Sequence, residues 1–302
     1  MELKRVVVTG LGALTPIGNT LPDYWESLKK GVSGAARITY FDPKHHKTQF
    51  ACELKGFNVN DFIHRKEARR MDKFSQYAMV VTDEAINDAG LTEGSFDPDR
   101  VGVIWGSGIG GLETFQDEAQ VLLKARESDT GPKFNPFFIP KMIADIAPGN
   151  ISIKHGYRGP NYTTVSACAS SSHALIDSFT YIRLGKADVI VTGGSEAAVN
   201  ETGIGGFNAC HALSTNNDKA ATASRPFDAT RDGFVLGEGA GAIILEEYEH
   251  AKARGANIYA EIVGGGMSAD AHHMTAPHPE GLGARNVMNY ALDDTGLSIE
   301  AV

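Results

Sequence analysis

The chain has 302 residues, 42% of them hydrophobic and 22% charged, with a formal net charge of −9. These values are typical of a globular protein with a substantial core, and the negative charge argues against nonspecific binding of nucleic acid. No apolar run approaches the roughly 18 residues of a membrane-spanning helix, and the first residues lack the apolar core of a signal peptide. We therefore expect a cytoplasmic protein without membrane insertion.

Strand-like and helix-like segments alternate along the chain. The expected strands, which are short and apolar, are 5–9, 101–105, 188–192, 240–245 and 258–263. The expected helices, with apolar residues at helical spacing, are 23–30, 72–89, 113–126, 171–184 and 246–254. This alternation predicts an α/β fold with substantial parallel pairing. Residues 128–148, rich in Pro and Phe, predict a structured excursion of the kind that often carries an interface.

The last strand-like segment echoes the first. A glycine-rich run, Gly264-Gly-Gly266, follows the last expected strand as Gly10-Leu-Gly12 follows the first. The echo predicts an internal duplication, with one unit over 1–255 and the start of a second over 256–302. No flexible linker separates the two units.

A glycine loop follows the second expected strand. Gly106-Ser-Gly-Ile-Gly-Gly111 matches the GxGxxG pattern of dinucleotide-binding loops, and a helix is expected after it. The acidic residue that should end a second strand about 20 residues later is missing, since Asp129 falls in a polar loop. A turn that permits close packing explains the glycines equally well, so both interpretations stay open.

The chain has three cysteines, and Cys168 is the most informative. Together with Cys52 and Cys210 it forms no CxxC pair, so we expect neither a disulfide framework nor a metal site. Cys168 lies among small residues at the expected start of a helix, where the helix dipole favours a thiolate. A nucleophile for acyl chemistry is one interpretation, and a small buried residue is the other.

Histidines and basic residues supply the other candidates. His173 follows Cys168 by five positions and would leave its helical face, so we expect it to pack or cap rather than act as a base. The only clustered alternatives are His272, His273 and His278, for which we expect at most a role in a substrate pocket. Residues 64–72 carry four basic side chains at helical spacing, which suit either a solvated face or a docking site for an anionic partner.

An ordered series of motifs resembles the elongating β-ketoacyl-acyl carrier protein synthases. The series consists of Val165-Ser-Ala-Cys-Ala-Ser170, Gly193-Gly-Ser-Glu196, Gly205-Gly-Phe207, Ala212-Leu-Ser214, Ala223-Ser-Arg-Pro-Phe-Asp228, the run Arg231 to Gly241, and Ser268-Ala-Asp-Ala-His-His-Met-Thr275. No single motif is decisive, but the order and spacing of the series are specific and cover essentially the whole chain.

The resemblance implies a fold and an activity. The fold would be thiolase-like, a layered α/β/α/β/α arrangement of two duplicated halves, the second incomplete here. The activity would be the decarboxylative condensation of an acyl group held on Cys168 with malonyl-acyl carrier protein, in fatty acid elongation. The resemblance also implies a homodimer and no cofactor of its own, because phosphopantetheine arrives on the acyl carrier protein. The match to GxGxxG would then be a false positive.

The resemblance also assigns roles to particular residues. Ile109 and Phe207 would line the acyl-chain pocket, Phe138 would reach the pocket of the other subunit, and Thr275 would lie beside the active site. The carrier protein would dock on a basic cluster whose assigned members are Lys66, Arg69 and Arg70. A further basic position of the family is occupied here by His211.

Three parts of the family pattern have no counterpart in the printed sequence. They are the His-Gly-Thr-x-Thr segment, the lysine with a second histidine, and the late glycine-rich loop. We therefore expect a C-terminally truncated chain that does not complete the condensation by itself. The alternatives are a polyketide-type ketosynthase, a thiolase that uses coenzyme A, and a noncatalytic subunit like a chain-length factor, although such subunits lack the active cysteine.

Overall fold

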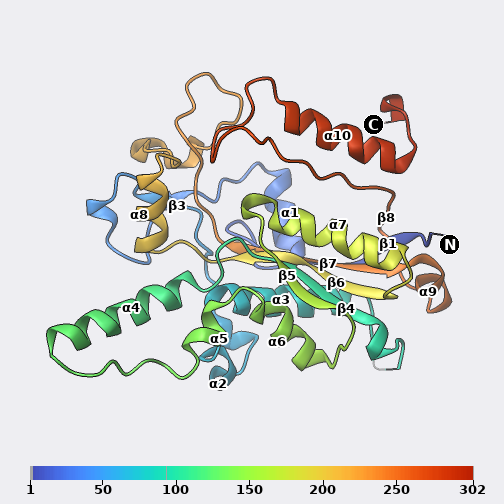
Figure 1. Ribbon diagram of the computed structural model, residues 1–302, viewed down its shortest axis with the longest axis horizontal. Coiled ribbons are helices and arrows are strands. Elements are labelled where there is room, and N and C mark those ends of the chain that lie inside the picture. Colours follow the sequence, from blue (N-terminus) through green and yellow to red (C-terminus); the bar gives the residue numbers. More distant parts are fainter. Residues whose placement is uncertain (1–2, 93, 302) are drawn as a thin grey trace.

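A six-stranded mixed sheet forms the centre of the fold, in the order β5-β4-β6-β7-β1-β8 (Figure 1). The computed structural model describes residues 3–92 and 94–301. The strands of this sheet are β1 (Val6–Leu14), β4 (Val101–Gly106), β5 (Asn161–Thr164), β6 (Val189–Glu196), β7 (Gly239–Glu247) and β8 (Ala260–Ile262). A separate two-stranded sheet pairs β2 (Ala36–Arg37) with β3 (Phe50–Ala51).

Helices cover both faces of the large sheet. The helices of the described residues are α1 (Leu21–Lys29), α2 (Arg65–Ala68), α3 (Lys73–Asp88), α4 (Leu112–Glu127), α5 (Phe138–Met142), α6 (Ile146–His155), α7 (Ser170–Arg183), α8 (Glu201–Ala209), α9 (Tyr248–Ala253) and α10 (Leu282–Thr295). Helices α3 and α6 lie on one face, α7 lies on the other, and α10 lies beyond α7 (Figure 1). The predicted excursion 128–148 leads from α4 through α5 into α6.

The strand directions are only partly those that the sequence predicts. β4 runs parallel to β5 and β6, as expected from alternating strands and helices. β7 instead runs antiparallel to both of its neighbours, β6 and β1. The alternation of elements did not reveal this, because the connection from β6 to β7 holds α8 and a long irregular stretch in place of one crossover helix.

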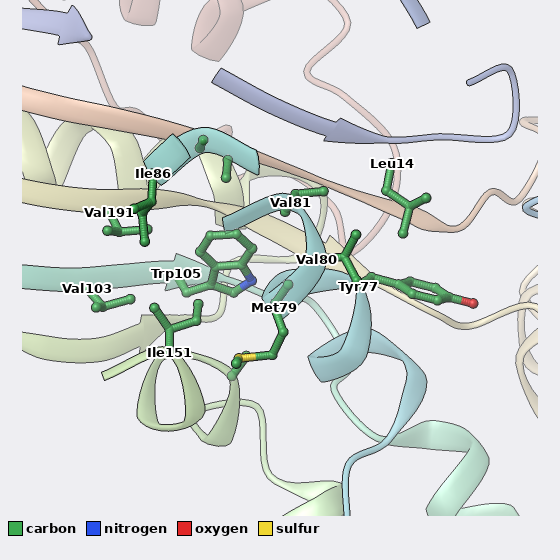
Figure 2. Packing of buried hydrophobic residues seen from close by; sticks show 14 of the residues in the cluster. Leu14, Tyr77, Met79, Val80, Val81, Ile86, Val103, Trp105, Ile151 and Val191 are labelled. Carbon is green, nitrogen blue, oxygen red and sulfur yellow. The ribbon is translucent and has the colours of Figure 1, made fainter. Parts of the chain in front are cut away.

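The central strands are apolar on both faces. In β4, Val103 and Trp105 belong to a cluster with α3 and α6, whereas Ile104 packs with residues of α7. Figure 2 shows Trp105 between Val191 and Ile151, and its indole N–H donates a 2.9 Å hydrogen bond to Ser195 Oγ. Strands that are buried on both faces have continuous apolar sequences, and for this reason the central strands could be predicted from the sequence.

The first strand extends further than predicted. We expected it to end at Thr9, but β1 continues through Gly10 and Gly12 to Leu14. A Cβ on Gly10 would lie 2.2 Å from the Ala85 carbonyl oxygen of α3, and one on Gly12 would lie 2.1 Å from that of Val81. The two glycines therefore allow α3 to press on the strand, and they do not end it.

Residues 256–302 are attached to this sheet. β8 pairs antiparallel with β1, and Arg5 forms a two-pronged ion pair with Glu261. A Cβ on Gly266 would lie 2.2 Å from the Val287 carbonyl oxygen of α10, so this glycine allows a close helix contact as Gly10 does. The division into units at 1–255 and 256–302 stays a prediction. The glycines that follow the first and the last expected strand nevertheless have the same packing role, since each allows a helix to approach closely.

The last predicted helix of the first unit begins later than expected. We expected a helix over 246–254, but Glu246 and Glu247 complete β7 and α9 begins at Tyr248. The Glu246 side chain is fully buried and accepts hydrogen bonds from Arg254, His250 and Thr9. A buried, paired carboxylate is not recognisable from the local pattern, which resembles an amphipathic helix.

Candidate active site

Cys168 lies in a single 3-10 turn, Ala167–Ala169, that joins β5 to α7. Ala167, just before it, has a φ of 50°, in the left-handed region that residues other than glycine seldom adopt. The Cys168 side chain is exposed. The sharp turn thus presents a thiol to solvent at the N-terminal end of α7, where the helix dipole favours negative charge. This geometry fits a nucleophile better than a packed, buried cysteine.

Ser170 holds the turn together. Its hydroxyl donates to the Ala167 carbonyl oxygen at 2.7 Å and accepts from the Ser166 amide at 2.8 Å. Its own carbonyl oxygen accepts from Thr164 Oγ1 at 2.8 Å. Ser170 is buried, so these bonds replace water for the polar groups of the turn. In the sequence, Ser170 is recognisable only as one of several small neighbours of Cys168.

His173 contacts the same turn from the first part of α7. Its Nδ1 lies 2.7 Å from Ser166 Oγ. This contact agrees with the expectation that His173 packs or caps. The hydrogen bond leads to Ser166 and not to the Cys168 thiol. His173 also lines a cavity of ≈ 320 Å³ between α7 and α10, next to Ala169 and Ser172.

Two glycines allow α7 to sit directly on the sheet. A Cβ on Gly106 would lie 2.5 Å from the Ser171 amide nitrogen. A Cβ on Gly194 would lie 2.0 Å from Ser171 Oγ. Because both glycines lack a side chain, the ends of β4 and β6 contact the first turn of α7 directly. This contact fixes the position of Cys168.

The glycine loop after β4 is occupied by a carboxylate. Glu196, the last residue of β6, accepts hydrogen bonds from the amides of Gly108 at 2.8 Å and Ile109 at 3.1 Å. A dinucleotide-binding loop would offer such amides to a phosphate. Here the protein uses them itself, which agrees with the packing interpretation of the loop. The sequence marks Glu196 only as part of the Gly193-Gly-Ser-Glu196 motif, although a glutamate among small residues shortly after an apolar run is a usable signal.

The four residues assigned to the substrate are found in different settings. Ile109 is exposed in the loop that lies against Ala167. Phe207 of α8 is half-buried in a cluster with Leu112, the residue that follows this loop. Phe138 is half-buried in α5. Thr275 is exposed in the loop after β8, where its amide donates to His273. The loop thus links Ile109 and Phe207 to the Cys168 region, whereas the described contacts do not bring Thr275 there.

The basic cluster is exposed and lies around the short helix α2. Lys66 belongs to that helix, and Arg69 and Arg70 follow it. Within 3–92 and 94–301, these three side chains form no ion pair with an acidic residue. Arg70 instead stands over the ring of Phe137, 5.2 Å from its centroid. The cluster therefore presents uncompensated positive charge on a protein of negative net charge.

No metal site is found among the described residues, which hold no group of three or more His, Cys, Asp or Glu side chains able to bind an ion. The rings of His272 and His278 contact each other edge to face, with centroids 5.3 Å apart. None of the helices in the described part of the chain has the length and apolarity needed to cross a membrane.

Family models match almost the whole chain. The N-terminal domain of β-ketoacyl synthases matches residues 3–251, and their C-terminal domain matches residues 259–302. The chain belongs to the β-ketoacyl synthase family. This synthase is 50% identical to the 3-oxoacyl-[acyl-carrier-protein] synthase 2 of Staphylococcus aureus, over 97% of this chain and 70% of that protein.

Solved structures confirm the thiolase-like fold of the synthase. A β-ketoacyl synthase from Burkholderia phymatum superposes with a TM-score of 0.88 at 36% identity, over 99% of this chain and 72% of that one. A type II polyketide synthase ketosynthase, solved with its acyl-carrier protein, superposes with a TM-score of 0.87 at 30% identity, over 100% of this chain and 72% of that one. The resemblance stated from the sequence is thereby confirmed, for both family and fold.

Proposed function

We propose that this synthase is a 3-oxoacyl-acyl carrier protein synthase of fatty acid elongation, with Cys168 as its acyl acceptor. The observation that carries the proposal is the exposed thiol at the start of α7, in a turn strained at Ala167. The 50% identity to a synthase of this name supports the choice of reaction. No metal or redox cofactor takes part in the proposed reaction, since the phosphopantetheine belongs to the carrier protein.

The reaction has two stages. In the first, the Cys168 thiolate attacks the carbonyl carbon of an acyl thioester, and the phosphopantetheine thiol of the carrier leaves as the new thioester forms. In the second, malonyl thioester loses CO₂, and the resulting carbanion attacks the acyl group on Cys168. The Cys168 thiolate then leaves, and the product is a 3-oxoacyl thioester on the carrier. The start of α7 offers positive dipole potential to the oxyanions of both stages.

The proposed partner is acyl carrier protein, docked on Lys66, Arg69 and Arg70. Their exposure supports this role, and so does their lack of ion pairs with other described residues, because an acidic partner needs a local positive site on a protein of charge −9. The superposed ketosynthase solved with its acyl-carrier protein supports the same class of partner. We place the enzyme in the cytoplasm, where its thiol would stay reduced.

We also propose a homodimer, with Phe138 near the pocket of the other subunit. Exposed apolar side chains around α5 support this assembly, and Phe134 lies against Phe138 with ring centroids 5.6 Å apart. The edge strand β5 also supports it, because its outer side has no partner strand among the described residues.

Mass spectrometry of the intact protein after incubation with acyl-acyl carrier protein tests the function. We expect one acyl group on the native protein, mapped to Cys168 by peptide analysis, and none on Cys168→Ser. Cys210→Ser is the matched control, because Cys210 is also free and exposed, and it should acylate normally. Acylation of Cys168→Ser, or equal transfer from acyl-coenzyme A without a carrier, would contradict the proposal. Adding malonyl-acyl carrier protein then tests the second stage separately, with formation of a 3-oxoacyl thioester on the carrier as its readout.

A further inference from the structure

Within the described part of the chain, the Glu196 carboxylate forms hydrogen bonds only with the glycine loop, and it thereby connects this loop to the sheet. Its Oε2 accepts from the amides of Gly108 and Ile109, and its Oε1 lies 3.5 Å from Ser107 Oγ. Among the described residues it forms no ion pair, so its charge is balanced by the loop amides and the Ser107 hydroxyl. Charge-assisted hydrogen bonds of this kind are about twice as strong as neutral ones.

Burial makes these loop contacts necessary. Desolvation raises the pKa of Glu196, although the amide bonds of Gly108 and Ile109 act in the opposite direction. A half-buried carboxylate that lost these donors would be left partly desolvated without partners, so the loop and Glu196 hold each other in place. A Cβ on Gly108 would lie only 2.9 Å from Glu196 Oε2, which explains the glycine at this position.

The same loop lies against the turn that carries the nucleophile. The position of a Cβ on Gly108 is 3.4 Å from the Ala167 carbonyl oxygen, and Ala167 directly precedes Cys168. On its far side the loop is tied to the end of α5, because the Gly111 amide donates to the Met142 carbonyl oxygen at 2.9 Å. Ile109 stands between these anchors and is 41% exposed.

We propose that Glu196 is a positioning residue that fixes Ile109 relative to Cys168 and thereby sets how well long acyl chains are accepted. The inference rests on the proposed function. Without the carboxylate, the amides of Gly108 and Ile109 lose their acceptor and Ile109 is free to shift. A short acyl group that does not reach Ile109 is then transferred normally, whereas a long one meets a displaced side chain.

The test compares Glu196→Ala and Glu196→Gln with the native protein in acyl transfer to Cys168. Butanoyl- and hexadecanoyl-acyl carrier protein are the two donors, and the rate of acyl-enzyme formation is followed by mass spectrometry. For Glu196→Ala we expect transfer of the long chain to fall by about tenfold or more relative to the short chain. Glu196→Gln keeps one carbonyl acceptor and should restore part of the ratio.

Two further readouts separate positioning from loss of structure. The rate of Cys168 alkylation by iodoacetamide should stay within about twofold of the native rate, because the turn has its own bonds through Ser170. Glu84→Gln is the matched control, since Glu84 also accepts from two backbone amides, those of Ala13 and Leu21, away from the site. It should leave the ratio of long to short transfer unchanged.

The outcomes differ for the two hypotheses. The role of Glu196 is overturned if the native protein is acylated but Glu196→Ala leaves the ratio of long-chain to short-chain transfer unchanged. It is also overturned if Glu196→Ala slows transfer from both donors equally and slows alkylation of Cys168. If the native protein itself is not acylated at Cys168, the proposed function fails first and the inference fails with it.

Discussion

Ser171 lies directly over Gly194, so closely that a Cβ on the glycine would stand 2.0 Å from the serine hydroxyl oxygen. The contact joins the end of β6 to the first turn of α7. Because Cys168 precedes this turn, any displacement of α7 at Gly194 is passed on to the thiol.

Replacing Gly194 by Ala should therefore affect both stability and reactivity. Overpacking at such a contact costs about 1–3 kcal/mol, and we expect a loss in this range in urea unfolding. The rate of Cys168 alkylation should change as well, because the turn must move. Gly149→Ala is the control, since a Cβ there meets only the tip of the Ile146 side chain, at 4.0 Å, in α6. A native alkylation rate in Gly194→Ala would contradict the link.

The ion pair between Glu246 and Arg254 should be important for stability. Both Glu246 oxygens accept from the Arg254 guanidinium at 2.6 Å, and the carboxylate is fully buried. Arg254→Met leaves this charge without its main partner and should cost about 3–5 kcal/mol in urea unfolding. Arg158→Met removes an exposed ion pair with Asp99 and should change stability little. A small loss in Arg254→Met would contradict this assignment.

The same pair predicts how stability depends on pH. Burial opposes the ionisation of Glu246, but hydrogen bonds from Arg254, His250 and Thr9 outweigh it and lower its pKa from the ordinary 4.5. A carboxyl whose pKa is lower in the folded state stabilises the fold above its unfolded pKa, and this contribution disappears as the pH falls through the folded value. A series of urea unfolding experiments from about pH 7 downwards should show the Arg254→Met deficit shrinking as the pH falls below the ordinary 4.5 and through the lowered folded pKa of Glu246. A deficit that is constant with pH would be inconsistent with this mechanism.

Charge reversal in the basic cluster should weaken carrier docking specifically. For the double variant Arg69→Glu and Arg70→Glu, we expect KM for acyl-acyl carrier protein in acyl transfer to rise by about tenfold or more at low salt, with a smaller effect at high salt. Lys30→Glu reverses an exposed charge next to α1 and serves as the control. Acylation from a small acyl thioester without a carrier should be unchanged. Equal losses with both donors would argue against docking.

The exposed apolar side chains around α5 should determine the oligomeric state. Ile139 is 55% exposed there, and a charge at this position would be buried without a partner in the proposed dimer. Ile139→Glu should therefore shift the protein towards the monomer in sedimentation velocity experiments. Ile153→Glu, at an exposed position of α6, is the matched control. A native protein that is already monomeric would contradict the dimer itself.

Much of the fold could be predicted because the central strands are buried on both faces. The continuous apolar runs of β4 and β6 placed these strands correctly, and Gly90 marked the end of α3. The extension of β1 past Gly10 could not be predicted, because it depends on the approach of α3 from a distant part of the chain. The antiparallel direction of β7 likewise depends on pairing between remote strands.

The candidate site was predicted less completely than the fold. Small neighbours and an expected helix start identified Cys168, but the φ of Ala167 and the bonds of Ser170 are properties of the folded turn. Glu196 illustrates the limit most clearly. Its partner amides lie almost 90 positions earlier, with 88 positions between it and Gly108, so no local pattern links them.

The place of β1 in the sheet has a consequence for biosynthesis. β1 leaves the ribosome well before its partner strands β7 and β8, and Thr9 bonds to Glu246 across 237 positions. Until β7 and β8 are made, both edges of β1 have no partner strand and stay open to other contacts. A nascent chain of this protein must therefore keep the apolar strand β1 unpaired until β7 and β8 are made, and binding by a chaperone would protect it best during this interval.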